Sequence, residues 1–267
     1  MRERILVVID PAADSQPALE RAIITAGIRE PHAELLLFAA VDGQAVATGA
    51  DNVALYRDRA WFEALFAQVD AAGIDHRCEV TWSTEWAAAV LRATHHFGAD
   101  LLLLPAPRVT RDARSQLSDG QWRVLRKAPC PVLMVQPGAK PRRQVVLAAL
   151  KGQSQDPRYE ALNRRIAERA RWMAARYGAQ LHVVNAYRDQ DDYPDRAQLI
   201  TLTGVPNAQV HVEDGPPDRV IAAVAGQIDA DIVVIGTLAR QGFAAVMRGN
   251  TSERVIAALP QDVMTLN

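Results

Sequence analysis

The sequence predicts an α/β fold of two tandem domains, each a five-stranded parallel open sheet with helices on both faces. Two observations predict it: an internal repeat, and short runs of Val, Ile and Leu that alternate with amphipathic helical stretches. Such runs are typical of strands buried on both faces of a parallel sheet. A chain of 267 residues is long enough for two domains that each bury a core.

The repeat is clearest near the end of each half. FGADLLLLPAPR (97–108) matches IDADIVVIGTLAR (228–240), and an offset of 131 residues brings Asp100 onto Asp231. The same offset aligns APCPVLMV (128–135) with LPQDVMTL (259–266). Between the two copies lies QPGAKPRR (136–143), a linker-like segment rich in proline and charge. We therefore place the domains at 1–138 and 142–267.

Each half is predicted to alternate strands with helices in the same order. In the second half, residues 159–177 have apolar side chains at helical spacing. The expected strands of that half are 145–150, 181–186, 209–212, 232–235 and 263–266. Three tryptophans of the first half, Trp82, Trp86 and Trp122, are expected to pack in the core or between the domains.

Composition narrows the class of protein. The net charge of −1 gives no reason to expect a surface for nucleic acid. The apolar run at the N-terminus is too short for a signal peptide, and no segment approaches the roughly 18 apolar residues of a membrane span. Cys78 and Cys130 have no C-x-x-C partner, so two free thiols are expected. Together these features favour a cytoplasmic protein without membrane insertion.

The segment GTLARQGFAAVMRGNTSERV (236–255) follows the expected strand 232–235. In an open parallel sheet, ligands bind beyond the carboxyl ends of the strands, where the strand order reverses. Asn250 and Glu253 have capping-box spacing, so a helix should begin here and end near Leu259. The free amides of a helix start attract anions. The residues alone leave two interpretations open: a phosphate-binding loop, or glycines that only turn the chain.

The same segment resembles the signature of the universal stress protein family, whose ATP-binding members carry G-x-x-G-x9-G-S/T after the fourth strand. The repeat makes the whole chain similar to tandem members, and WRVLRKAPCPVLMV (122–135) resembles the end of their first half. The resemblance implies a Rossmann-like, adenine nucleotide alpha hydrolase-like fold. It also implies an intramolecular pseudo-dimer of the two halves and ATP as the ligand. It leaves open whether Mg²⁺ accompanies ATP and whether two chains form a homodimer.

The resemblance transfers unevenly onto the second half. Gly236 and Gly249 fill the first and third glycine positions, whereas Ala239 replaces the second. Lys151 replaces the acidic residue that usually ends the first strand of these proteins. The implied nucleotide-binding positions are Lys151, Val183, Gly236, Ala239, Arg240, Gly249, Asn250 and Thr251. Of these, Val183 matches the position whose backbone meets the adenine, and Asn250 and Thr251 match the polar residues that face the phosphates.

The first half keeps the acidic residue of the family pattern but lacks the glycines of its phosphate loop. Asp10 keeps the acidic position, but Pro105 stands where Gly236 stands and Arg108 where Ala239 stands. Proline fixes φ and has no backbone donor. The phosphate loop of the first half is therefore expected to be degenerate, and this half to act as a partner module or to bind another small ligand.

Three kinds of function remain after this comparison. The chain is a stress-response protein that binds an adenine nucleotide as a regulatory module, a slow ATPase or nucleotide transferase, or a scaffold with vestigial pockets. The sequence has no G-x-x-x-x-G-K-S/T loop and no G-x-S-x-G elbow. We therefore expect ATP binding in the second half and at most slow hydrolysis.

Overall fold

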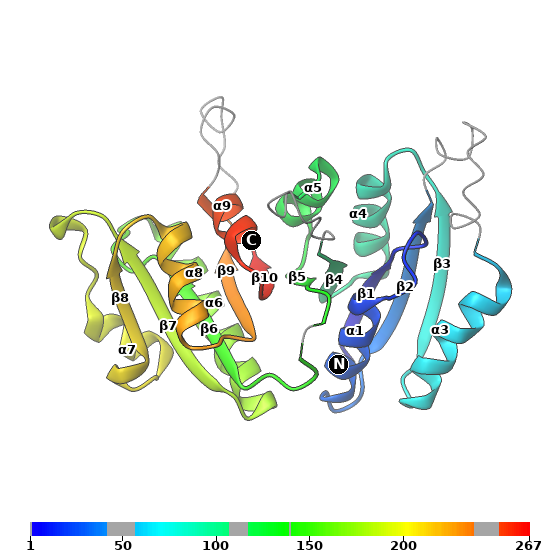
Figure 1. The fold of residues 1–267 in the computed structure, drawn as a ribbon, viewed down its shortest axis with the longest axis horizontal. Helices are drawn as coiled ribbons and strands as arrows, with labels where there is room; N and C mark the ends of the chain where they lie inside the picture. The colour runs from blue at the N-terminus through cyan, green and yellow to red at the C-terminus, as the bar shows by residue number, and fades with distance from the viewer. Residues whose placement is uncertain (1, 42–56, 107–116, 139, 238–250) are drawn as a thin grey trace. The chain divides into compact units, whose positions relative to one another are not determined.

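The computed structural model describes residues 2–41, 57–106, 117–138, 140–237 and 251–267. These residues divide into two compact units, of which the first ends at Gly138 and the second at Asn267 (Figure 1). Within the described residues no helix is both long enough and apolar enough to cross a membrane.

The first unit is an α/β layer of parallel strands in the order β3-β2-β1-β4-β5. Helices α4 and α5 pack against each other on one face of the sheet. The strands are β1 (Arg4–Ile9), β2 (Glu34–Val41), β3 (His76–Trp82), β4 (Leu101–Pro105) and β5 (Val132–Val135). The helices are α1 (Pro17–Gly27), α3 (Arg59–Ala71), α4 (Trp86–Phe97) and α5 (Asp119–Lys127).

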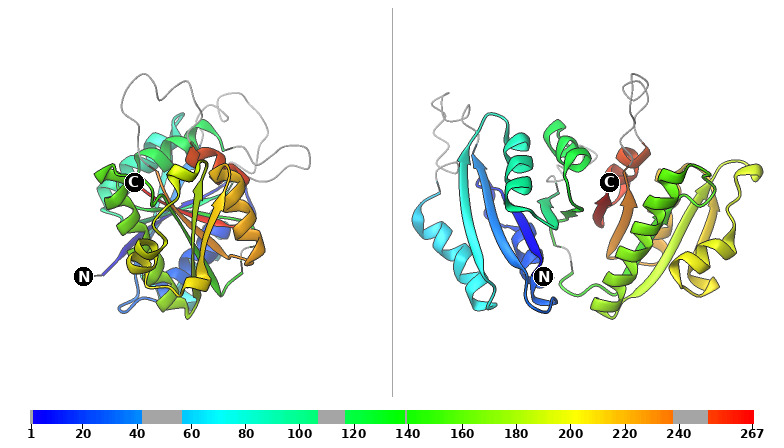
Figure 2. Two further views of the ribbon diagram at one scale, coloured as in Figure 1. Left: turned by 90° about the vertical axis from the view of Figure 1, so that its left-hand side faces the viewer. Right: turned by 180° about the vertical axis from the view of Figure 1, so that it is seen from behind.

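The second unit repeats this arrangement with the strand order β8-β7-β6-β9-β10, again parallel throughout. Figures 1 and 2 show α6 and α7 on one face of its sheet and α8 and α9 on the other. The strands are β6 (Val145–Leu150), β7 (Gln180–Tyr187), β8 (Val210–Asp214), β9 (Ile232–Gly236) and β10 (Asp262–Leu266). The helices are α6 (Pro157–Tyr177), α7 (Arg196–Thr203), α8 (Pro217–Gln227) and α9 (Thr251–Ala258), with 3₁₀ turns η2 (Gln190–Asp192) and η3 (Asn207–Gln209).

The predicted fold class is confirmed, and the five strands expected in the second half agree with the observed ones to within two residues at each end. The reason is that the central strands are buried on both faces. Ile232, Val233 and Val234 of β9 are fully inaccessible, as are Val146 and Leu147 of β6. Continuous apolar runs are the sequence pattern of such strands.

Helix α6 shows how local sequence sets an element. Asp156 caps its start by accepting a hydrogen bond from the Arg158 amide, and Pro157 occupies the first turn. Gly178 ends the helix in the left-handed conformation, with φ 63°. Its buried side chains recur at helical spacing, so one face of α6 covers the sheet. They are Leu162, Asn163, Ile166, Ala167, Ala170, Met173 and Ala174.

Two expectations need correction. Arg143 was placed in the linker, but its guanidinium is 1% exposed and lies 2.8 Å from the carboxylate of Asp262, itself fully buried. The chain therefore enters the core of the second unit at Arg143. Trp82 was expected to pack, yet it is 56% exposed at the end of the edge strand β3. An edge strand lacks one neighbour, so its side chains have fewer groups to cover them.

Candidate functional site

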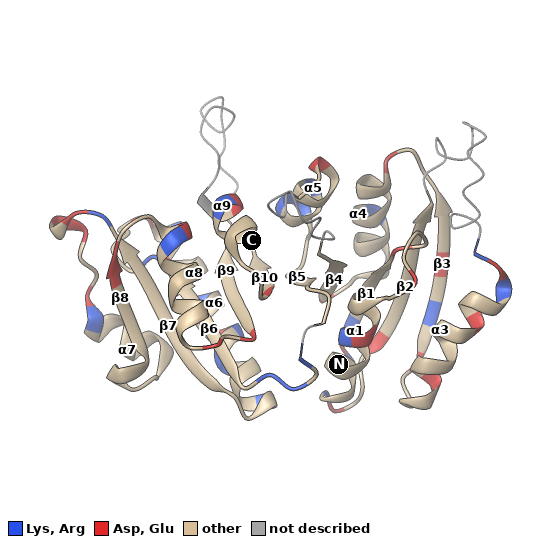
Figure 3. Ribbon diagram, in the orientation of Figure 1, with Lys and Arg blue, Asp and Glu red and all other residues tan. Residues whose placement is uncertain are grey.

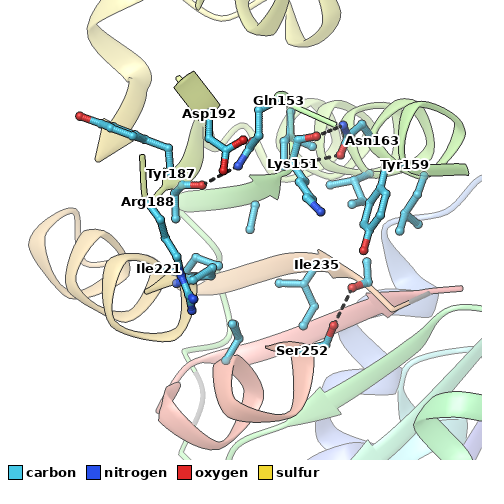
Figure 4. A pocket seen from close by; sticks show the side chains of 18 of the residues that line it. Lys151, Gln153, Tyr159, Asn163, Tyr187, Arg188, Asp192, Ile221, Ile235 and Ser252 are labelled. Atoms are coloured by element: carbon cyan, nitrogen blue, oxygen red, sulfur yellow. Dashed lines mark hydrogen bonds between the residues drawn. The ribbon is translucent and has the colours of Figure 1, made fainter. Parts of the chain in front are cut away.

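A cavity of about 530 Å³ lies at the carboxyl edge of the second sheet (Figure 4). From β6 the chain adds β7 and β8 on one side, and from β9 it adds β10 on the other, so the strand order reverses between β6 and β9. The cavity is lined by the ends of both strands and by the starts of the helices that follow. This is the place where open parallel sheets bind ligands.

Apolar and aromatic side chains form much of the cavity wall. Leu162 and Ile166 come from α6, Ile221 from α8, Ile235 from β9 and Val255 from α9. Tyr159 and Tyr187 add two rings to the lining. Apolar side chains of this kind beside polar groups are typical of pockets for small organic ligands.

The charged residues of the cavity are mostly basic. Lys151, Arg188 and Arg254 line it, against the single acid Asp192 among its described lining residues. The strands β6 and β9 carry no charged residue, so these cations come from strand ends and helix starts (Figure 3). Arg254 Nε lies 3.9 Å from Asp218 Oδ1. This distance is long for an ion pair, so the interaction of Arg254 with Asp218 is weak. The lining therefore suits an anionic ligand.

Lys151 is the first residue after β6, and its backbone is held from both sides. The Lys151 amide donates to Asn163 Oδ1 at 3.1 Å, and Asn163 Nδ2 donates to the Lys151 carbonyl at 3.0 Å. The Lys151 ammonium lies 4.1 Å from the centre of the Tyr159 ring, a cation–π contact. Figure 4 shows this side chain on the cavity side of α6. The lysine is thus presented to the cavity from a fixed backbone.

A network of amide side chains fixes the loop that follows Lys151. The Gly152 amide donates to Asn185 Oδ1 at 2.6 Å, and Asn185 Nδ2 donates to Gln153 Oε1 at 3.0 Å. Gln153 Nε2 in turn donates to the carbonyl of Ala186 at 3.0 Å. Asn185 is fully buried, and a satisfied buried network of this kind rigidifies its surroundings. The loop after β6 is therefore tied to the end of β7.

Gly236 lines the cavity, and the structure gives it a packing role. A Cβ at this position would lie 2.3 Å from Leu162 Cδ2 and 2.6 Å from Leu162 Cγ, so any side chain would collide with α6. The Gly236 carbonyl accepts a hydrogen bond from Ser252 Oγ at 3.1 Å. The equivalent carbonyl in the first unit, that of Pro105, accepts from Gln121 Nε2 at 3.3 Å. Both units thus tether the fourth strand to the helix that follows.

The other implied residues are placed unevenly. Val183 is fully buried in the middle of β7 and is absent from the cavity lining, which instead contains Ala186 and Tyr187. β7 continues for four residues beyond Val183, and the expected contact of the Val183 backbone with adenine stays a prediction. Thr251 begins α9, as the spacing predicted. The remaining positions, Ala239, Arg240, Gly249 and Asn250, lie outside the described residues.

The first unit holds the corresponding positions with other residues. The amide of Asp10 donates to Gln16 Oε1 at 3.0 Å, and Gln16 Nε2 donates to the Asp10 carbonyl at 2.7 Å. Ser118 and Gln121 form a capping box at the start of α5. Gly120 packs against Trp86, whose ring would lie 2.6 Å from an added Cβ. Of these residues, Ser118 and Gly120 stand where Gly249 and Thr251 stand in the second half, and both have structural partners within the first unit.

Sequence reasoning missed several residues that line the cavity. Tyr159 and Asn163 lie on α6, where helical periodicity identifies a buried face but not the part of it that reaches a ligand. Arg188 follows strand β7, and Arg254 lies in the first turn of helix α9. The chain is rich in arginine, so neither residue stands out in the sequence. The available signal was their position at the carboxyl edge of the sheet.

The fold and the cavity together define a tandem α/β protein with a cationic pocket at the switch point of its second sheet. The sequence profile of the Universal stress protein family matches residues 1–136 and 198–267. The chain therefore belongs to the universal stress protein family.

Individual relatives agree with this assignment. Universal stress protein E of Escherichia coli K12 is 28% identical over 300 aligned positions, which cover 100% of this chain and 94% of that protein. A crystal structure of a functionally unknown protein of Pseudomonas aeruginosa PAO1 is similar with a TM-score of 0.82 and 26% identity, covering 99% of this chain and 92% of the other. A universal stress protein from Archaeoglobus fulgidus, with a TM-score of 0.68, 17% identity and coverage of 99% and 96%, shares the fold.

Proposed function

We propose that the cavity of the second unit binds an adenine nucleotide, with ATP preferred, and that the protein acts as a regulatory binding module in the stress response. The observation that carries this proposal is a cavity at the switch point of the sheet whose charged lining residues, in the part of the chain that the structure describes, are three cations and one acid. Family membership adds that a nucleotide is the ligand class to test first. A cavity of about 530 Å³ is within the usual size range for such ligands.

The arrangement suggests how the parts of a nucleotide would be accommodated. The apolar wall and the rings of Tyr159 and Tyr187 suit a base, which has two flat faces. Lys151 and Arg254 would contact the phosphates, because charge-assisted hydrogen bonds to phosphate oxygens are among the stronger ones. Of the two, Lys151 is the stronger candidate for a phosphate contact, because hydrogen bonds from Asn163 fix its backbone.

Whether Mg²⁺ accompanies the nucleotide depends on the ligands that the protein offers. Mg²⁺ prefers an octahedron of oxygen ligands, and carboxylates are its usual protein ligands. Asp192 is the one carboxylate among the described lining residues, and Lys151 stands at the end of the first strand. This lining does not fit a metal held by the protein, so any Mg²⁺ would enter on the phosphates of the nucleotide.

The test is a titration of the full chain with AMP, ADP and ATP by calorimetry, for the wild type and for Lys151→Ala. A partly exposed lysine–phosphate contact contributes about 1–2 kcal/mol, so the variant should bind ATP roughly five- to thirtyfold more weakly. AMP should change less, because only the longer phosphate tail reaches the ammonium. Lys127→Ala, in α5 of the first unit, is the matched control and should leave all three affinities unchanged.

Two results would count against the proposal. If the wild type binds none of the three nucleotides, the cavity serves another ligand or none. If ATP and AMP weaken equally in Lys151→Ala, the lysine supports the fold of the loop and does not contact the phosphates.

A further inference from the structure

Arg188 differs from the other cations that line the cavity. Lys151 lies against the Tyr159 ring, and Arg254 faces Asp218 at 3.9 Å. The guanidinium of Arg188 has no hydrogen-bond or ion-pair partner in the part of the chain that the structure describes. A guanidinium carries five N–H donors in a fixed fork that matches the oxygens of a phosphate. The donors of Arg188 are therefore available to an anionic group of a ligand.

Arg188 and Lys151 reach the cavity from different sides. Each is the first residue after its strand, Lys151 after β6 and Arg188 after β7, and these strands are neighbours in the sheet. Figure 4 shows the Lys151 side chain beside Tyr159 of α6 and the Arg188 side chain directed toward Ile221 of α8. Helices α6 and α8 cover opposite faces of the sheet (Figures 1 and 2). The cavity therefore offers positive charge at two separate places.

An acid follows Arg188 in the chain without pairing with it in the described structure. Asp192 ends the 3₁₀ turn η2, and the Tyr193 ring packs edge-on against Tyr187 with centroids 5.2 Å apart, which holds this turn to the end of β7. Figure 4 shows Asp192 beside Gln153. In dinucleotide-binding folds an acid binds a ribose hydroxyl, or an arginine nearby accommodates a phosphate on that hydroxyl. The end of β7 presents both residue types, which suits a ribose that carries a phosphate.

We propose that the preferred ligand of the cavity is an adenine nucleotide with a phosphate on its ribose, in addition to the phosphates on its 5′ oxygen. Arg188 would bind the ribose phosphate through charge-assisted hydrogen bonds, and Lys151 would contact the 5′ phosphates. A nucleotide with a single phosphate tail leaves Arg188 without a partner. This inference rests on the proposed nucleotide-binding function and narrows its ligand class to nucleotides with phosphates at two places on the sugar.

The test separates the two phosphate positions by calorimetry of the full chain with AMP, ADP, adenosine 3′,5′-bisphosphate and adenosine 2′,5′-bisphosphate. ADP and the bisphosphates carry the same number of phosphates and differ in where the second one is attached. We expect at least one bisphosphate to bind the wild type about five- to thirtyfold more tightly than AMP, because one charge-assisted contact is added. Arg188→Gln should abolish this gain but keep the gain of ADP over AMP, whereas Lys151→Ala should do the reverse.

Arg176→Gln is the matched control, because Arg176 is an exposed arginine in the last turn of α6, at the far end of that helix from the cavity. It should retain the wild-type gain. Arg188 is exposed as well, so its substitution leaves the core intact. Equal binding of AMP and both bisphosphates, or a gain that survives Arg188→Gln, would overturn this inference and leave the nucleotide proposal standing. If none of the four nucleotides binds, both proposals fail.

Discussion

At the scale of single residues, the two units hold the first strand–helix junction by the same chemistry with different residues. Gln16 clamps the backbone of Asp10, and Asn163 clamps that of Lys151. A neutral amide offers a donor and an acceptor at once, which a carboxylate or an ammonium does not. The clamp therefore acts on the backbone alone, and the side chain beside it can change from acid to base without loss of the junction. Gln16 and Asn163 occupy different positions relative to their strands, which is why the repeat did not reveal them.

A pair of histidines, His182 on β7 and His211 on β8, whose facing ring nitrogens are 3.1 Å apart, leads to a prediction about pH. The pKa of both His182 and His211 is lowered in the folded state, so the unfolded chain binds more protons below the ordinary histidine pKa. Stability should therefore be fully present above about pH 6.5 and should decline as the pH falls below that value. Denaturant unfolding between pH 7.5 and 5.5 measures this trend.

The control for the pH experiment is the double variant His182→Gln/His211→Gln, which removes both groups. We expect its stability to fall less than that of the wild type over the same range. Carboxylates with a lowered pKa, such as Asp75 and Asp156, titrate at lower pH and contribute equally to both proteins. An equal decline in wild type and variant would show that other groups cause the loss.

At the scale of elements, Gly236 joins β9 to α6 by close approach. Leu162 fills the space that a side chain at 236 would need, and the backbone of Gly236 is not in the left-handed region. The sequence left the role of this glycine open between ligand contact and chain turning, and its packing against α6 was not expected. Its packing against Leu162 depends on a helix 74 residues away in sequence, a contact that no local pattern shows.

We therefore predict that Gly236→Ala lowers the free energy of unfolding by about 1–3 kcal/mol, the usual cost of overpacking. Gly226→Ala is the matched control: this glycine is exposed in α8, and an added Cβ meets no atom within 4 Å. That change should be neutral or stabilising by up to about 1 kcal/mol, because alanine is the better helix former. Chemical denaturation of both variants provides the comparison. Equal effects would mean that Leu162 moves aside at little cost.

At the scale of the whole molecule, the fold of both halves could be predicted because the chain repeats itself, whereas the residues of the cavity wall could not, because they differ between the halves. The parallel sheets and the strand boundaries followed from the repeat and the apolar runs, because burial on both faces leaves continuous apolar stretches, and the family followed from the resemblance of residues 236–255 to its signature. The cavity wall did not follow, since Tyr159, Arg188 and Arg254 meet only when distant elements pack together. The expected pseudo-dimer of the two halves stays a prediction.

The last prediction concerns how many nucleotides one chain binds. The second unit places Lys151, a cation that attracts phosphates, at the end of its first strand, whereas the first unit places Asp10 at that point. Pro105 also replaces Gly236 at the end of the fourth strand. Calorimetry of the full chain with ATP should therefore give one site per chain. Lys151→Glu should weaken that site, while Asp10→Asn should leave both its stoichiometry and its affinity unchanged. A stoichiometry of two, or loss of binding in Asp10→Asn alone, would move the nucleotide to the first unit.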